Sequence, residues 1–280
     1  MPDLGTRIEA QAGALPPAER RVAEVILADP SAAAFATVAE LARRAGASGA
    51  TVVRLAVRLG YDGWVGLQAE ARARLDQHLR PAAERIHEAL DDDVLSATAA
   101  REAENVHRTL AAVDRDAFDR AVAHLADPKR DVYVIAGDAQ AGIGTFLVDA
   151  LDLLRPGVRR VAGPAPSVAR SLAHIAGGDV VVAVDLRRYE AWIPEAVALA
   201  RARGAQVVAV TDSVLSPLAE HADATFTVVA EGAGPFDSHV GTLALANALS
   251  SAVAGRLRRT AARRLDEVES AWQHLSALAD

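Results

Sequence analysis

Residues 37–59 read TVAELARRAGASGATVVRLAVRL, the pattern of two short helices joined by a tight turn. Thr37 suits the start of the first helix, because Glu40 three residues later completes a capping box. Gly46 suits its end, because glycine accepts the left-handed backbone conformation that commonly closes a helix. Ser48 then suits the start of the second helix. The stretch therefore predicts a helix-turn-helix.

The second helix has one apolar and one polar face. The residues predicted to face inward are Val52, Leu55, Ala56 and Leu59, and those predicted to face outward are Gly49, Thr51, Arg54 and Arg58. A helix-turn-helix places the N-terminal half of its second helix in the major groove of DNA. Arg54 suits a guanine edge, Thr51 a base edge or a phosphate, and Arg58 a phosphate. With the helix starts that favour phosphate, the candidate DNA contacts are Thr37, Arg44, Ser48, Thr51, Arg54 and Arg58. The alternative is an ordinary three-helix bundle with solvated arginines.

Helical patterns continue on both sides of this stretch. An earlier helix opens within residues 15–19, with proline in its first turn, and stops at Asp29-Pro30. Two later helices are expected over residues 94–112 and 115–126, after a polar connection around Pro81. The expected organisation is a helix-turn-helix domain over 1–76, a helical linker over 77–104 and a second domain over 105–280.

The pattern changes at Asp131, where short runs rich in β-branched residues begin. Five such runs cover residues 132–136, 158–162, 180–184, 206–210 and 224–229. Runs that are nearly continuously apolar are typical of parallel strands covered on both faces. We therefore expect a multidomain α and α/β chain, whose second domain is a three-layer α/β/α structure with a five-stranded parallel sheet. A helix over 238–259 and a last amphipathic helix reaching Leu278 are expected to close it.

The chain resembles the RpiR/MurR family of bacterial transcription regulators. The N-terminal likeness is carried by LPPAERRVAEVILADP (15–30), TVAELARRAGASGATVVRLAVRLGYDGW (37–64) and GLQAEARARL (66–75), with Gly49-Ala50 where the family more often has a polar or acidic residue. Residues 105–260 resemble the sugar isomerase (SIS) domain of the same family, most specifically in the T-D-S-x-x-S-P-L-A run at 211–219. The resemblance implies a DNA-binding regulator that senses a sugar phosphate or a related metabolite.

Ligands of such sheets bind at the carboxyl ends of the strands, near the point where the strand order reverses. The residues expected there are Gly137, Gln140, Asp185, Arg187, Arg188, Thr211, Ser213 and Ser216. SIS domains usually carry S-x-S-G-x-T after the third strand to hold a phosphate, whereas this chain has DLRRYE (185–190). One hypothesis is that Arg187 and Arg188 clamp an anionic ligand, and pair with Asp185 or Glu190 when the site is empty. The other is that the site has lost phosphosugar binding, and both arginines pair with Asp and Glu in a structural or dimer-contact role.

Composition narrows the functions further. The absence of cysteine excludes disulfides and thiolate metal sites, and no histidine spacing suits zinc, so no metal, cofactor or catalytic residue is expected. The net charge of −7 is uneven, since residues 1–80 hold ten arginines against nine acidic residues, which suits a chain that binds DNA at one end. Without a signal peptide or an apolar run of membrane length, we expect a soluble cytoplasmic protein with no membrane partner.

The expected partners are a palindromic double-stranded DNA operator, a small-molecule effector and further copies of the chain. One recognition helix buries too little surface for tight binding, which favours a homodimer or homotetramer. The apolar segment Thr242–Val253 is the expected subunit interface. Two other functions stay open: a ligand-free dimer whose α/β domain serves only for assembly, and a sugar-phosphate isomerase with acid–base residues among His221, His239 and Glu231.

Overall fold

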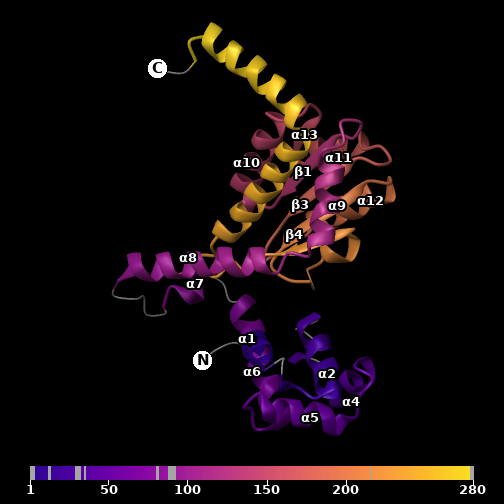
Figure 1. Ribbon diagram of the computed structural model, residues 1–280, viewed down its shortest axis with the longest axis vertical. Helices are drawn as coiled ribbons and strands as arrows, with labels where there is room; N and C mark the ends of the chain where they lie inside the picture. The colour runs from indigo at the N-terminus through magenta and orange to yellow at the C-terminus, as the bar shows by residue number, and fades with distance from the viewer. Residues whose placement is uncertain are drawn as a thin grey trace. The chain divides into compact units, whose positions relative to one another are not determined.

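The computed structural model describes residues 4–11, 14–28, 33–34, 36–79, 82–87, 93–214 and 216–277. The chain divides into two compact units, Met1–Pro81 and Ala82–Asp280. The first consists of helices, and the second contains a sheet covered by helices (Figure 1). No helix in the described ranges is long and apolar enough to span a membrane.

The N-terminal unit is built around a single apolar core. Its helices are α1 (Leu4–Gln11), α2 (Pro17–Ala28), α4 (Val38–Arg44), α5 (Gly49–Arg58) and α6 (Gly63–Leu79). Ile26, Leu41 and Leu55 from three of these helices are at most 2% exposed, so α2, α4 and α5 share the core. The predicted stop of α2 at Asp29-Pro30 lies outside the described residues.

The turn between α4 and α5 is fixed by backbone conformation and by α2. Thr37 and Glu40 form the predicted capping box at the start of α4, and Gly46 follows its end with φ +56°, the left-handed conformation that glycine adopts without strain. Arg21 of α2 donates to the carbonyls of Ala45 at 3.1 Å and Gly46 at 3.0 Å. The predicted helix-turn-helix is confirmed, and α2 holds its two helices at a set angle.

The second unit contains the predicted five-stranded parallel sheet. The strands are β1 (Val132–Ala136), β2 (Val158–Val161), β3 (Val180–Val184), β4 (Gln206–Thr211) and β5 (Ala224–Thr227), in the order β2-β1-β3-β4-β5. β2 is not the apolar run that was expected, since Arg159 and Arg160 are exposed on it. It tolerates them because it is an edge strand and is not fully covered by helices.

Helices cover both faces of the sheet. Alternate residues of β1 show this, because Val134 packs in one core cluster and Tyr133 in another. One face is covered by α9 (Arg115–Leu125), α10 (Ala141–Asp152) and α13 (Val240–His274), and the other by α11 (Ala165–Ala173) and α12 (Trp192–Ala202). The short α7 (Ala82–Arg85) and α8 (Val94–Ala111) precede them, and α8 packs on α13 (Figure 1). The three-layer α/β/α prediction is confirmed.

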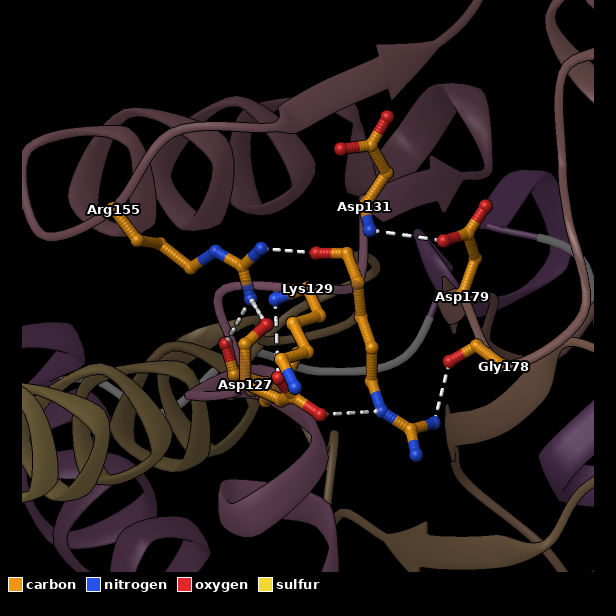
Figure 2. Close-up of polar contacts among 8 residues, drawn as sticks. Asp127, Lys129, Asp131, Arg155, Gly178 and Asp179 are labelled. Carbon is orange, nitrogen blue, oxygen red and sulfur yellow. Dashed lines mark hydrogen bonds and ion pairs between the residues drawn. The ribbon is translucent and has the colours of Figure 1, made fainter.

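Buried charges fasten the amino ends of the strands, as Figure 2 shows. Arg155 is 2% exposed and donates to the carbonyls of Leu125 at 2.6 Å and Asp127 at 2.9 Å. The carboxylate of Asp179 accepts from the N–H of Asp131 at 2.9 Å, which ties the start of β3 to that of β1. Backbone groups satisfy both side chains, so these buried charges serve to hold the amino ends of the strands in place.

The C-terminal region differs from expectation in two ways. The two predicted helices form one helix, α13, of 35 residues, because no proline interrupts residues 240–274. The segment Thr242–Val253 is not a free apolar surface, since Leu245, Leu249 and Val253 lie in the core of their own unit. Helices α8, α9 and α10 pack on α13, so most of its apolar side chains are accounted for within the unit, and a subunit interface at this segment stays a prediction.

Candidate DNA-reading helix and ligand pocket

The exposed face of α5 carries two arginines and two valines. The side chains of Arg54 and Arg58 are 64% and 44% exposed, and Val53 and Val57 are 39% and 58% exposed. Arg44, in the last turn of α4, is exposed as well. Arginines that bind guanine edges and phosphates, alternating with apolar groups that contact thymine methyls, suit a DNA major groove.

Thr51 is not on this face, so its prediction as a DNA contact is wrong. It is 3% exposed; its hydroxyl lies 2.9 Å from Ser48 Oγ and accepts a hydrogen bond from Arg54 Nη2 at 3.1 Å. Thr51 therefore positions Arg54 without reaching DNA itself. Gly49 is also explained by packing, because a Cβ there would lie 3.1 Å from a methyl group of Val38. A small residue lets α4 and α5 approach one another.

The start of α4 is closed by its own capping box. The N–H and the hydroxyl of Thr37 both donate to Glu40 Oε2 at 2.8 Å. The hydrogen bonds from Thr37 lower the pKa of Glu40, so in the DNA-free chain a carboxylate already binds the groups of Thr37 that were predicted to contact a DNA phosphate, and that contact stays a prediction. Ser48 is exposed at the start of α5, where its hydroxyl accepts from the N–H of Thr51 at 3.3 Å.

A buried carboxylate lies behind the arginines of α5. Glu19 of α2 is 4% exposed, and its Oε2 accepts from Arg58 Nε at 2.7 Å, while its Oε1 lies 3.9 Å from Arg54 Nε. A buried carboxylate needs such partners. Glu19 therefore holds both arginines over α5, a role that sequence spacing did not reveal because the residues are more than thirty positions apart.

A pocket of about 270 Å³ lies at the carboxyl ends of β1 and β3, where the strand order reverses. It is lined by Ala82, Arg85, Ala139, Gln140, Asp185, Leu186, Arg187, Arg188, Glu190, Phe236, Asp237 and His239. Thr211, Ser213 and Ser216 do not line it, so their prediction as ligand contacts is not supported by the geometry. Thr211 and Ser216 are buried, and Asp212 reaches the loop after β3 in their place, accepting from the N–H of Arg187 at 3.1 Å.

Two carboxylates, those of Asp185 and Glu190, lie in the wall of the pocket. Asp185 is 2% exposed and accepts from the N–H of Glu190 at 2.9 Å; burial raises its pKa to about 7, although that hydrogen bond opposes the rise. Glu190 in turn accepts from the N–H of Asp138 and from Trp192 Nε1. Gly137 is needed beneath them, because a Cβ there would come within 2.6 Å of Asp185 Oδ1.

Two arginines of the pocket bind Asp237, and not Asp185 or Glu190 as expected. Arg187 Nε donates to Asp237 Oδ1 at 3.0 Å, and Arg85 Nη1 donates to the same oxygen at 2.8 Å. We call these three residues the Arg85–Asp237–Arg187 bridge. Burial would raise the pKa of Asp237, but the hydrogen bonds from the two arginines bring it below its usual value. Asp185 and Glu190 are not the partners of Arg187, so that expectation is wrong, and Arg188 is exposed with φ +64°.

The residues considered for isomerase chemistry do not converge. Glu231 binds Arg101 at 2.7 Å, and His221 lies in a short 3₁₀ turn that is not part of the pocket wall. Only His239 of the three lines the pocket, directly before the start of α13.

Two family models match this chain. A helix-turn-helix domain of the rpiR family matches residues 3–79, and an SIS domain matches residues 124–252. Together they cover more than half of the chain. The chain belongs to the RpiR family. An RpiR-type helix-turn-helix joined to an SIS domain makes it a DNA-binding transcription regulator.

Solved structures agree with this assignment. The sugar isomerase domain of an RpiR transcription factor from Sphaerobacter thermophilus is 28% identical, with a TM-score of 0.58 over 62% of this chain and 97% of that chain. Vibrio vulnificus NanR, complexed with ManNAc-6P, is 22% identical, with a TM-score of 0.57 over 99% of this chain and 100% of that one. The c3406 protein of Escherichia coli CFT073 is 19% identical, with a TM-score of 0.53 over 62% and 95%. The last two show the fold alone, and no curated protein sequence matches the chain.

Two pocket residues of this RpiR-family chain escaped the sequence analysis. Arg85 was assigned to the linker, and Asp237 lies in the loop before α13, which carries no motif. The sequence offered one signal: Arg187 was expected at the end of a buried strand, where an arginine needs a carboxylate partner. Sequence spacing does not show which carboxylate that partner is.

Proposed function

We propose that this RpiR-family regulator binds a palindromic operator as a homo-oligomer and changes its affinity when a small anionic, carbohydrate-derived metabolite enters the pocket. On the DNA side, Arg54 is the candidate for direct contact with guanine, while Arg44, Ser48 and Arg58 are candidates for phosphate contacts. Their exposure around α5 supports this assignment.

The observation that carries the ligand proposal is a pair of unsatisfied polar atoms in the pocket wall. Arg85 Nε and His239 Nδ1 are buried and have no hydrogen-bond partner among the described residues. Leaving such an atom unpaired costs about 1–3 kcal/mol, so a bound molecule that shifts these side chains and lets the atoms find partners is favoured. Sugar phosphates are the first candidates, because NanR, which shares the fold, is complexed with ManNAc-6P.

The Arg85–Asp237–Arg187 bridge supplies the anion site. A phosphate or carboxylate on the ligand can replace Asp237 between the two guanidinium groups, which bind such anions through paired N–H groups. Arg187 is 8% exposed, so exchanging one anion for another keeps its charge neutralised throughout. Gln140, Asp185 and Arg188 then contact the rest of the ligand, with Gly137 shaping the loop beneath them.

The same exchange links the pocket to DNA binding. Arg85 ends α7, the first described helix after the N-terminal unit. A ligand that draws Arg85 away from Asp237 alters how α7 is held, and hence how the connection between the two units is restrained. A ligand shifts an equilibrium only by interacting differently with its two states, and the bridge provides that difference.

The DNA proposal is tested by selecting an operator from random duplexes and measuring affinities by fluorescence anisotropy. Arg54→Ala should lose about 1–3 kcal/mol on the selected site and relax base preference at one position. Arg58→Ala should weaken binding to all sequences and lower the salt slope by about one phosphate contact. Arg115→Ala, an exposed change on α9, is the control. If both α5 variants bind like wild type, α5 is not the recognition helix.

The rival proposal is an SIS domain that only assembles the oligomer. One observation favours it: Asp185 and Glu190 already occupy the N–H groups of the loops that would hold a phosphate. A thermal-shift screen with phosphorylated and unphosphorylated sugars and sugar acids separates the two. If no compound raises the melting temperature or changes operator affinity, the assembly role stands. We propose no isomerase activity in either case, because the expected acid–base residues do not meet in the pocket.

A further inference from the structure

Three side-chain oxygens lie over Gly137 at the pocket end of β1. A Cβ on this glycine would lie 2.6 Å from Gln140 Oε1, 2.6 Å from Asp185 Oδ1 and 3.3 Å from Glu190 Oε1. We call Gln140, Asp185 and Glu190 the acceptor cluster, because amide and carboxylate oxygens accept hydrogen bonds. All three residues line the pocket, so a ligand that enters the pocket can reach this cluster.

Gln140 directs its side-chain oxygen toward the two acids without gaining a hydrogen bond inside the protein. It is only 5% exposed. It stands directly before α10, yet its side chain does not cap that helix. Its amide also makes no hydrogen bond to any other residue in the described part of the chain. Buried polar groups normally have partners, so the Gln140 oxygen is available to a donor on a bound molecule.

The oxygens of the acceptor cluster repel one another unless a donor lies between them. In the ligand-free chain a proton on Asp185 serves this purpose, because burial raises the pKa of Asp185 to about 7, and the charges of Glu190 and Asp212 add to the rise. One proton makes one hydrogen bond, whereas the cluster presents three accepting side chains. A ligand group with several donors and a positive charge therefore satisfies more of the cluster than the proton does.

A primary ammonium group has the donors that this cluster needs. It carries three N–H donors and no acceptor, and its hydrogen bonds to carboxylates are charge-assisted. A hydroxyl brings one donor only, and a phosphate would bring negative charge beside two acids. A divalent metal ion suits the cluster less well, because calcium and magnesium take about six or more oxygen ligands. Within the described ranges, no group of three or more histidine, aspartate or glutamate side chains is placed to bind a metal ion.

We propose that the effector carries a protonated amine, which the acceptor cluster binds, in addition to the anionic group that binds the Arg85–Asp237–Arg187 bridge. This inference rests on the sensor function proposed above and narrows the effector to a molecule with both charges, of the class of amino sugar phosphates. The cluster and the bridge line the same pocket of about 270 Å³, so one small molecule can reach both. Their opposite charges also determine the direction in which the ligand binds.

The test is isothermal titration calorimetry of the full chain with pairs of phosphates that differ only in an amine or a hydroxyl. The pairs are glucosamine 6-phosphate with glucose 6-phosphate, galactosamine 6-phosphate with galactose 6-phosphate, and 2-aminoethyl phosphate with 2-hydroxyethyl phosphate. In at least one pair, the amine should bind about tenfold more tightly than the hydroxyl compound, as expected for roughly one additional hydrogen bond between charged groups.

Variants of the pocket assign that preference to the acceptor cluster. Asp185→Asn should lower the preference to about threefold, because charge-assisted hydrogen bonds are roughly twice as strong as neutral ones, and Asp185→Asn with Glu190→Gln should abolish it. Gln140→Ala breaks no hydrogen bond within the described chain and should also lower it. Arg187→Ala should weaken both members of a pair alike. Asp119→Asn, an exposed change on α9, is the control, and circular dichroism checks that each variant is folded.

Four outcomes would overturn the inference. If the hydroxyl compounds bind as tightly as the amines in every pair, the inference is wrong while the sensor function stands. A preference for the amine that survives in the variants of Gln140, Asp185 and Glu190 places the amine elsewhere. If magnesium or calcium alone raises the melting temperature of wild type but not of Asp185→Asn, the cluster binds a metal ion instead. If no compound of any pair binds, the sensor function fails and this inference fails with it.

Discussion

Asp185 combines a buried carboxyl with two neighbouring acids, and its protonation follows from that setting. Burial raises its pKa from an ordinary value of 3.8 to about 7, with Glu190 and Asp212 adding to the rise. The folded chain therefore holds this proton more tightly than the unfolded chain, and folding gains from it at low pH. As pH rises from about 4 to about 7, that gain is lost at up to about 1.4 kcal/mol per pH unit.

Replacing this carboxyl by an amide should remove the pH dependence. Asp185→Asn keeps an oxygen for the N–H of Glu190 but has no proton to lose. We expect its unfolding free energy, relative to wild type, to be higher at pH 8 than at pH 5, measured by denaturant titration. Asp119→Asn, an exposed change on α9, is the control. Parallel pH profiles for wild type and Asp185→Asn would contradict the raised pKa.

Single residues show where sequence reasoning reaches its limit. Helical spacing identified the buried face of α5 but misplaced Thr51, because this residue lies at the edge of that face and only the packing of α2 and α4 decides its burial. The arginines after β3 were expected to need acids, yet Asp237 is fifty positions from Arg187 and no local pattern indicates it. Local bonds such as the capping box were predictable; partners distant in sequence were not.

At the scale of elements, α13 contains two glycines with opposite requirements. A Cβ at Gly255 would meet nothing within 4 Å, whereas one at Gly241 would lie 2.7 Å from Thr109 Oγ1 and from the carbonyl oxygen of Val229. Gly255→Ala should raise the unfolding free energy by about 0.5–1 kcal/mol, because alanine loses less backbone entropy in a helix. Gly241→Ala should lower it. Melting temperatures of the two variants check this pair, and a lower value for Gly255→Ala would contradict it.

The valines of α5 predict how the operator is recognised. Val53 and Val57 flank Arg54 and are too exposed to serve the core. In the major groove they can contact the methyl group of thymine. Uracil in place of a contacted thymine should cost about 0.8 kcal/mol, roughly fourfold in affinity. Binding measured on duplexes with single thymine-to-uracil changes tests this, and Val57→Ala should abolish the difference at one position. Equal affinity at every thymine would exclude such contacts.

Elements were predictable where their signals were local. The strands and the helix-turn-helix followed from apolar runs, capping residues and glycines, and both are confirmed. The expected division of α13 into two helices is wrong, because no residue near position 259 breaks a helix. The exposed arginines of β2 were similarly misread, because edge position depends on the order of strands in the sheet.

At the scale of the whole molecule, the Arg85–Asp237–Arg187 bridge predicts that one substitution can remove the ligand response without changing ligand-free DNA binding. Arg187→Ala should abolish the effect of the effector on operator affinity while leaving ligand-free affinity near that of wild type. The lost coupling should be about 1–3 kcal/mol, the usual range between linked sites. Arg187→Lys should rescue it poorly, because lysine cannot make paired contacts. Titrating effector into the protein–operator complex measures this, and a normal response from Arg187→Ala would place the ligand elsewhere.

The chain order of the two units was predictable, since helical and strand periodicities occupy separate stretches of the sequence. The subunit contact was not, because an apolar helix looks the same whether it is buried within its own unit or against a partner. The largest apolar side chains of Thr242–Val253 pack within their own unit, and only the packing of α8, α9 and α10 on α13 shows this.

The length of α13 allows it to transmit a displacement from one end to the other. It starts directly after His239 in the pocket wall and continues beyond the sheet domain, so its 35 residues form a rod about 52 Å long. A displacement of about 1–2 Å at one end, typical of helix shifts between states, is delivered at the other without any relay of side chains. A change at the pocket is then carried to the far end of the molecule by the stiffness of a single helix, and Gly255, which has no side chain, is where that stiffness is lowest.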